Sequence, residues 1–140
     1  MCDIEFYISG TPMPLKRHRM TRGGRVYDPS CTDKRNWMKQ ARDFCPDEPV
    51  SGALKVTLEF TMPRPKSHFG TGRNAGKLKN SAPKHHLHTP DLDNLVKFVL
   101  DAMNGQFYVD DSQIISINCS KRLADSPEEC GTIVRICSVE

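Results

Sequence analysis

Four aspartates in the second half of the sequence could bind a divalent metal ion. Asp91 and Asp93 lie two residues apart, and Asp110 and Asp111 are adjacent further along the chain. Mg²⁺ takes oxygen ligands, usually one or two carboxylates together with phosphate oxygens of a substrate. The two pairs could share an ion if the chain folds back between them. The alternative is structural, because carboxylates in the first helical turn favour the helix dipole and Asp110-Asp111 is typical of a polar turn.

Lys97 is placed to interact with the first acidic pair. It lies four residues after Asp93, and Asp101 lies four residues after Lys97, so the three share one face of a helix. The ammonium group could neutralise charge that develops on a phosphate beside the carboxylates. The three side chains could equally form surface ion pairs worth about 0.2–0.5 kcal/mol each. The spacing leaves both interpretations open.

Positive charge is concentrated in two segments that contain no acid. Residues 11–25 hold five Lys and Arg residues, and residues 64–88 hold six. Such unmixed charge favours a polyanion such as the nucleic-acid backbone as the partner. The candidate DNA contacts are Lys16, Arg17, Arg19, Arg64, Lys66, Arg73, Lys77, Lys79 and Lys84, with Phe69 as a candidate wedge or base-stacking ring.

Three histidines, His85, His86 and His88, precede the first acidic pair. A zinc site is disfavoured, because zinc needs rigidly spaced Cys and His ligands and no cysteine lies nearby in sequence. We interpret the histidines as polar surface near the acidic residues, where they could contact phosphate.

Hydrophobic periodicity predicts the elements that carry these residues. Alternating apolar residues predict strands at 3–9, 53–62, 114–121 and 132–139. Helical spacing predicts helices at 33–45 and 90–103, with Thr32 and Thr89 as their N-caps. Gly23-Gly24 indicates a turn, and residues 63–83 read as a long, mobile basic loop.

Composition limits the class of protein. The chain has 140 residues, 26% of them charged and 37% hydrophobic, which fits one domain over residues 1–140 and excludes wholesale disorder. No apolar stretch approaches the roughly 18 residues of a membrane span, and the first residues do not resemble a signal peptide. Six cysteines without metal-binding spacing favour reduced thiols and a cytoplasmic location.

Three ordered motifs resemble the signature of the RusA family of Holliday junction resolvases. They are Pro90-Asp-Leu-Asp-Asn-Leu-Val-Lys97, Asp101-Ala-Met-Asn-Gly105 and Asp110-Asp-Ser-Gln-Ile114, and Gly10 to Arg19 resembles the family's opening. The family consists of small metal-dependent endodeoxyribonucleases found largely in phages and prophages. The resemblance implies that Asp91, Asp93 and Asp111 are metal-binding catalytic carboxylates, that Lys97 is the catalytic lysine, and that Asp110 is a neighbouring acid in the metal site.

The resemblance also implies an α+β fold, with a mixed sheet flanked by two main helices, and a homodimer with two active sites. We therefore expect a Mg²⁺- or Mn²⁺-dependent endonuclease that resolves four-way junctions or other branched DNA in recombination and repair. Two alternatives remain: a non-catalytic nucleic-acid-binding module, and a nuclease acting on flaps or single strands. Thr89 stands where many relatives carry a basic residue, and the 64–83 segment is atypically basic, so substrate preference stays open.

Overall fold

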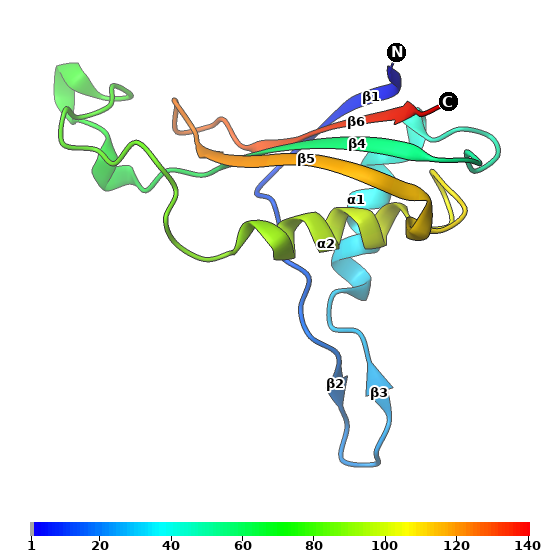
Figure 1. Cartoon of the computed structure of the whole chain (residues 1–140). Coiled ribbons are helices and arrows are strands. Elements are labelled where there is room, and N and C mark those ends of the chain that lie inside the picture. The colour runs from blue at the N-terminus through cyan, green and yellow to red at the C-terminus, as the bar shows by residue number, and fades with distance from the viewer. Residues whose placement is uncertain (1) are drawn as a thin grey trace.

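The computed structural model describes residues 2–140 and contains a four-stranded mixed sheet with two α-helices on one face (Figure 1). The strands lie in the order β1-β6-β4-β5, with bounds β1 Cys2–Ser9, β4 Leu54–Met62, β5 Ile114–Leu123 and β6 Gly131–Ser138. β6 is antiparallel to β1 and to β4, whereas β4 and β5 are parallel. The α+β class and the mixed sheet are therefore confirmed.

The core lies between the sheet and the helices. Alternate residues of β4 point into it and are at most 2% exposed: Leu54, Val56, Leu58, Phe60 and Met62. Helix α2, Leu92–Met103, buries its apolar stripe against them through Leu95, Phe98, Val99 and Met103. The opposite sheet face is polar, and Arg135 forms ion pairs there with Glu5 and Glu59. This one-sided covering explains the alternation seen in the strand sequences.

The two helices begin at residues other than the predicted caps. Helix α1 spans Cys31–Ala41 and continues into a 3-10 turn at Arg42–Phe44, and its N-cap is Ser30 rather than Thr32. The N-cap of α2 is Asp91, not Thr89.

The sequence predicted that Asp93, Lys97 and Asp101 could form ion pairs along one face of α2. The structure contains the pair of Asp93 with Lys97, but Asp101 pairs elsewhere. Asp101 pairs with Lys34 of α1 at 2.5 Å, and the same ammonium contacts Asp28. Asp101 therefore ties the two helices together and has a partner outside its own helix.

A two-stranded hairpin projects from the helix layer, away from the sheet (Figure 1). Its strands are β2, Arg19–Met20, and β3, Val26–Tyr27, which pair antiparallel. We call residues 16–27 the basic arm. The Gly23-Gly24 turn was predicted, but the flanking strands were not.

The segment at 63–83 contains more local structure than a plain loop. It forms 3-10 turns at Lys66–His68 and Gly72–Asn74, and Phe69 pairs with Leu78 in an isolated bridge. Phe69 is only 5% exposed, so its ring is not free to act as a wedge or a stacking platform here. Arg64 is 8% exposed and donates to the carbonyls of Ala124 and Pro83 at 2.8 and 2.6 Å. Its guanidinium anchors the segment, which corrects its assignment as a DNA contact. Mobility of the segment stays a prediction.

Two predictions about cellular context have partial outcomes. Cys31, Cys45, Cys119 and Cys130 are free thiols, but Cys137 is disulfide-bonded, so uniformly reduced cysteines were a wrong expectation. The side chain of Cys2 lies outside the described residues. Within residues 2–140, neither helix has the length and apolar character needed to cross a bilayer.

Candidate metal and DNA site

The N-terminal end of α2 presents carboxylates that the protein itself leaves largely unused. Asp91 is the N-cap residue, yet its side chain makes no capping hydrogen bond and has no other partner among residues 2–140. Asp93 lies in the first turn and contacts Lys97, with 3.7 Å between Nζ and Oδ2. These two side chains are 68% and 61% exposed. Carboxylate oxygens are therefore available to a cation, with an ammonium group beside them.

Asp110 and Asp111 are neighbours with different surroundings. The Asp110 carboxylate accepts a hydrogen bond from the Ser112 N–H at 3.1 Å and caps the 3-10 turn Asp111–Gln113. Hydrogen bonds from the Ser112 side chain and backbone hold the pKa of Asp110 below its ordinary value. The Asp111 carboxylate is exposed and has no hydrogen-bond or ion-pair partner in the described chain. Asp110 thus stabilises the turn that presents Asp111.

Gln113 completes this turn. Its side-chain oxygen accepts from the N–H groups of Val109 and Asp110 at 2.8 and 2.9 Å. Its amide nitrogen donates to the carbonyls of Val50 and Gly52, both at 2.9 Å. The turn is therefore attached to the chain just before β4. The sequence left the role of Gln113 ambiguous.

The turn with Asp111 lies at the C-terminal end of α2. Helix α2 has 12 residues, which corresponds to a length of about 18 Å. At its C-terminal end the Tyr108 hydroxyl donates to the Leu100 carbonyl at 2.5 Å, and burial raises the pKa of Tyr108. Asp111 follows three residues later, immediately before β5.

Asp91 lies at the opposite end of the same helix, where β5 finishes. The Lys121 ammonium donates to the carbonyls of His88 and Pro90 at 2.9 and 3.0 Å, and so holds the residues that lead into Asp91. Accordingly, no three His, Cys, Asp or Glu side chains within residues 2–140 are grouped to hold a metal ion. A single copy of the chain does not bring Asp91, Asp93 and Asp111 together.

The root of the basic arm lies beside the N-terminal end of α2. The Leu15 N–H donates to the Asn94 carbonyl at 3.0 Å, and the Lys16 N–H donates to the buried Ser30 hydroxyl at 2.9 Å. A groove of about 340 Å³ separates this root from Asp91 and is lined also by Pro14, Thr89 and Pro90. Lys16, Arg17 and Arg19 are all exposed and continue from this root along the arm.

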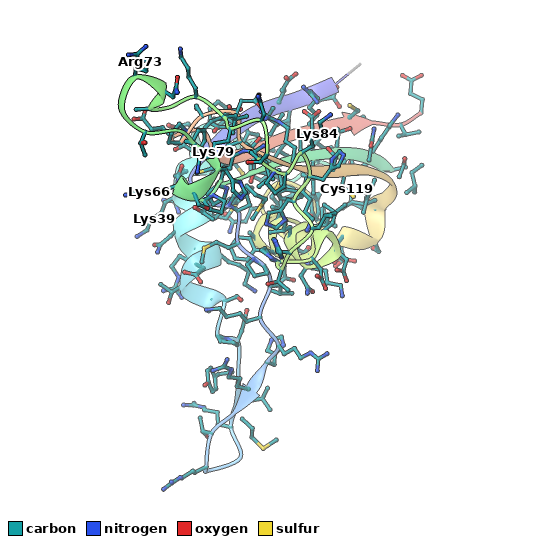
Figure 2. All side chains as sticks on the ribbon, turned by 90° about the vertical axis from the view of Figure 1, so that its left-hand side faces the viewer. Lys39, Lys66, Arg73, Lys79, Lys84 and Cys119 are labelled. Atoms are coloured by element: carbon teal, nitrogen blue, oxygen red, sulfur yellow. The ribbon has the colours of Figure 1, made fainter. Side chains whose placement is uncertain are left out.

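The second basic segment lies at one end of the molecule, beyond the N-terminal end of α2 (Figure 1). Figure 2 looks at this end and shows Lys66, Arg73, Lys79 and Lys84 spread over it. These four and Lys77 are exposed. The N-terminal acids of α2 therefore lie between two groups of cations.

The histidines line a small cavity next to this region. His68, His85, His86 and His88 surround about 120 Å³ together with Pro63, Pro65, Pro83 and Leu123. The His86 Nδ1 atom is buried without a hydrogen-bond partner, and burial, with the charge of Lys121, lowers the pKa of His86. These histidines therefore line a pocket within the described chain, and their role stays a prediction.

Comparison with known proteins decides the family. The model of the family described as Endodeoxyribonuclease RusA matches residues 9–136. The chain belongs to the RusA family. It is also 33% identical over 135 residues to a Bacillus subtilis protein named uncharacterized protein YqaN, and the match covers 89% of this chain and 90% of that protein.

Membership of the RusA family confirms the resemblance found in the motifs and implies an endodeoxyribonuclease that hydrolyses DNA. The motifs did not reveal the supporting contacts made by Lys121, Lys34 and Arg64. Among their partners, Asp101 lies 67 positions from Lys34, Pro83 lies 19 from Arg64 and His88 lies 33 from Lys121. Spacing within one element carries no signal for such distant pairs.

Proposed function

We propose that this protein is a Mg²⁺- or Mn²⁺-dependent endonuclease that resolves Holliday junctions or related branched DNA, with its metal site formed between two copies of the chain. One observation carries the proposal. Asp91, Asp93 and Asp111 are exposed carboxylates that the fold leaves available, but they occupy opposite ends of α2. A role in recombination and repair is part of the proposal.

Two-fold symmetry supplies the arrangement that one copy lacks. In an isologous dimer whose two-fold axis is perpendicular to α2, the two copies of this helix run antiparallel, so the start of one would lie beside the end of the other. Asp91 and Asp93 of one copy would then face Asp111 of the second copy. The symmetry creates two equivalent sites, which suits paired cuts in two strands of a four-way junction.

The edge strand β5 offers a surface for this dimer. Ile115 and Ile117 are 63% and 44% exposed, and Val109 beside the Asp111 turn is 61% exposed. Exposed apolar side chains along a sheet edge favour association with another chain. This surface adjoins the turn that carries Asp111, so association here would place that carboxylate at the contact between copies.

The donor set fits Mg²⁺, because all three candidate ligands are carboxylates with oxygens free to coordinate. A metal ion held there would polarise a phosphodiester and activate water for its hydrolysis. Lys97 would stabilise negative charge on the phosphate, since its exposed ammonium lies beside Asp93. Lys121 would hold the backbone before Asp91, and Asp110 would hold the turn before Asp111.

The DNA backbone would be bound by the cations on both sides of the site. The set now comprises Lys16, Arg17, Arg19, Lys66, Arg73, Lys77, Lys79 and Lys84, all exposed. Arg64 and Phe69 are left out because both are buried and engaged within the protein. Phosphate contacts of this kind position a duplex without reading its sequence.

Mixing two inactive variants tests the shared site. Asp93→Asn and Asp111→Asn proteins are each expected to be inactive, but a mixed dimer would contain one site with all ligands intact. Random mixing of equal amounts should therefore restore about a quarter of the wild-type sites. The measurement is cutting of a synthetic four-way junction with Mg²⁺, after the two proteins are unfolded and refolded together. A matched mixture of Asp91→Asn with Asp93→Asn should restore nothing, because both losses fall on the same side of the site.

The outcomes separate the alternatives. Inactive wild-type protein that binds junctions would indicate a non-catalytic DNA-binding module. Faster cutting of a flap or a single strand than of a junction would change the substrate and leave the site unaffected. If the Asp93→Asn and Asp111→Asn mixture stays inactive while wild type cuts, the site does not form between copies.

A further inference from the structure

We infer that the basic arm, residues 16–27, docks as a two-stranded ribbon in the major groove of a DNA duplex arm. The inference rests on the proposed function, and it assigns a partner to the projecting part of the molecule. Among the residues of the arm, the sequence predicted DNA-backbone contacts only for Lys16, Arg17 and Arg19. The structure adds the shape of the element and the two cations at its tip, Arg22 and Arg25.

The arm has a defined shape although it stands away from the core. Arg19 pairs with Tyr27 and Met20 with Val26, and the Thr21 N–H donates to the Arg25 carbonyl at 2.8 Å. Gly24 has a φ of 82°, a left-handed conformation that glycine adopts readily, and it closes the tip. The hydrogen bond from Lys16 to Ser30 joins the two legs at the root. Both figures show the arm extending away from the sheet.

Nothing in the described chain covers the arm, for every residue from 16 to 27 is exposed. Met20 is 69% exposed, Val26 is 61% exposed and Tyr27 is 43% exposed. A two-stranded ribbon with uncovered apolar side chains is marginal in water, so a partner that covers it would stabilise it. The arm is therefore expected to gain order on binding.

Charge selects the class of that partner. The arm carries Lys16, Arg17, Arg19, Arg22 and Arg25 with His18 and no acid. The nearest acid, Asp28, already pairs with Lys34 and accepts from the Ser30 N–H. Two arms of this charge would repel each other, whereas a polyanion would bind them. DNA is the polyanion of the proposed function.

Groove width selects the mode of binding. Paired strands lie about 4.8 Å apart before side chains are added. The major groove of B-DNA, about 12 Å wide, admits a two-stranded ribbon without deformation, whereas the minor groove, about 6 Å wide, has to be widened to take one, which costs energy. The cations on the first leg and at the tip could then contact phosphates on the walls of the groove. The exposed Met20 and Val26 would face the floor of the groove.

The test removes the two tip cations in Arg22→Gln/Arg25→Gln. Junction affinity should fall, and the slope of log K against log salt should become shallower by about 1.8, which is about 0.9 for each lost phosphate contact. A matched control, Lys39→Gln/Arg42→Gln, changes exposed positions within α1 and directly after it. It removes the same charge and should leave the slope unchanged.

A second measurement probes the groove directly. A junction whose cytosines carry glucosyl groups in the major groove should bind wild-type protein more weakly, whereas a minor-groove ligand should not compete. An unchanged salt slope in the tip variant, or competition by the minor-groove ligand alone, would overturn the inference. A change in the mass of the DNA-free variant would also overturn it, by showing that the arm contacts a second copy. Failure of the proposed function is a separate result, absence of cutting by wild-type protein.

Discussion

The two ends of helix α2 both carry aspartates, but they use them differently. Near the C-terminal end, Asp101 pairs with Lys34 and Asp110 caps a turn, so both carboxylates have structural partners. At the N-terminal end, Asp91 has no partner in the described chain and Asp93 has only an exposed lysine at 3.7 Å. Sequence spacing did not show which of these aspartates have a structural role. The interaction partners in the structure do, because a carboxylate with a structural partner differs from one that is left available as a candidate metal ligand.

Asp111 is the exception. It lies at the same end of α2 as Asp101 and Asp110, but its carboxylate, like that of Asp91, has no partner in the described chain. The comparison therefore predicts opposite behaviour for two adjacent residues. Asp111→Asn should reduce junction cutting by at least about a thousandfold, because metal-assisted stabilisation is worth several kcal/mol. Asp110→Asn should cut within about threefold of wild type, because an asparagine oxygen can still accept from the Ser112 N–H.

Single-turnover cutting with excess protein measures both variants, and junction binding without metal serves as their control. Equal losses in Asp110→Asn and Asp111→Asn would end the distinction between structural and free carboxylates. Normal cutting by Asp111→Asn would remove that residue from the site.

The lysines at the two ends extend the comparison. Lys97→Met should slow cutting about a hundredfold with little change in junction affinity, in line with the loss of one group that stabilises transition-state charge. Lys34→Met is the matched change at the lysine that pairs with Asp101. It should lower the melting temperature, because Asp28 and Asp101 lose their shared partner. Its cutting rate below the melting transition should stay near that of wild type. An unchanged rate in Lys97→Met would make its contact with Asp93 a surface ion pair only.

The dimer surface gives a smaller and concentration-dependent effect. Ile117→Lys places a charge on the exposed edge of β5, so it should weaken association and reduce cutting about tenfold at low protein concentration, with recovery at high concentration. Asn118→Lys, on the polar face of the same strand, is the control and should stay dimeric. Light scattering measures the mass of both. A monomeric wild type that cuts junctions would contradict the shared site.

Local pattern predicted much of this fold, because strands and amphipathic helices follow side-chain periodicity. The strand predicted at 53–62 is Leu54–Met62, and the helix predicted at 90–103 is Leu92–Met103. The candidate acids were also identified from sequence, through their order in the motifs. The separation of Asp91 and Asp93 from Asp111 by the length of α2 was not predicted, because it depends on β5 running back along α2.

Other misses have the same physical origin. The sequence placed Asp101 with Lys97, but Lys34, 67 positions away, pairs with it instead. Arg64 and Phe69 looked like loop residues free to contact DNA, because local composition does not reveal that they pack against distant segments. The strands of the basic arm have two residues each, too few for any alternation to register.

The smallest expected effect concerns how the stability of the turn beyond the C-terminal end of α2 depends on pH. Hydrogen bonds from Ser112 hold the pKa of Asp110 below its ordinary value, so its ionised carboxylate stabilises the folded state. This contribution is fully present above about pH 4 and is lost as pH falls through the lowered pKa. Asp110→Ala should therefore melt below wild type at pH 7, and the gap should narrow on acidification.

Ser112→Ala separates the two hydrogen bonds that act on Asp110. It removes the hydroxyl, the largest cause of the lowered pKa, and keeps the backbone N–H. The difference in melting temperature between Ser112→Ala and wild type should also narrow on acidification. At pH 7 this difference should be smaller than that of Asp110→Ala. Thermal melts at pH 7 and near pH 3 make the comparison. A gap of constant size for Asp110→Ala would mean that the carboxylate is not what stabilises this turn, and Asp110 would then return to the acids available for metal binding beside Asp111.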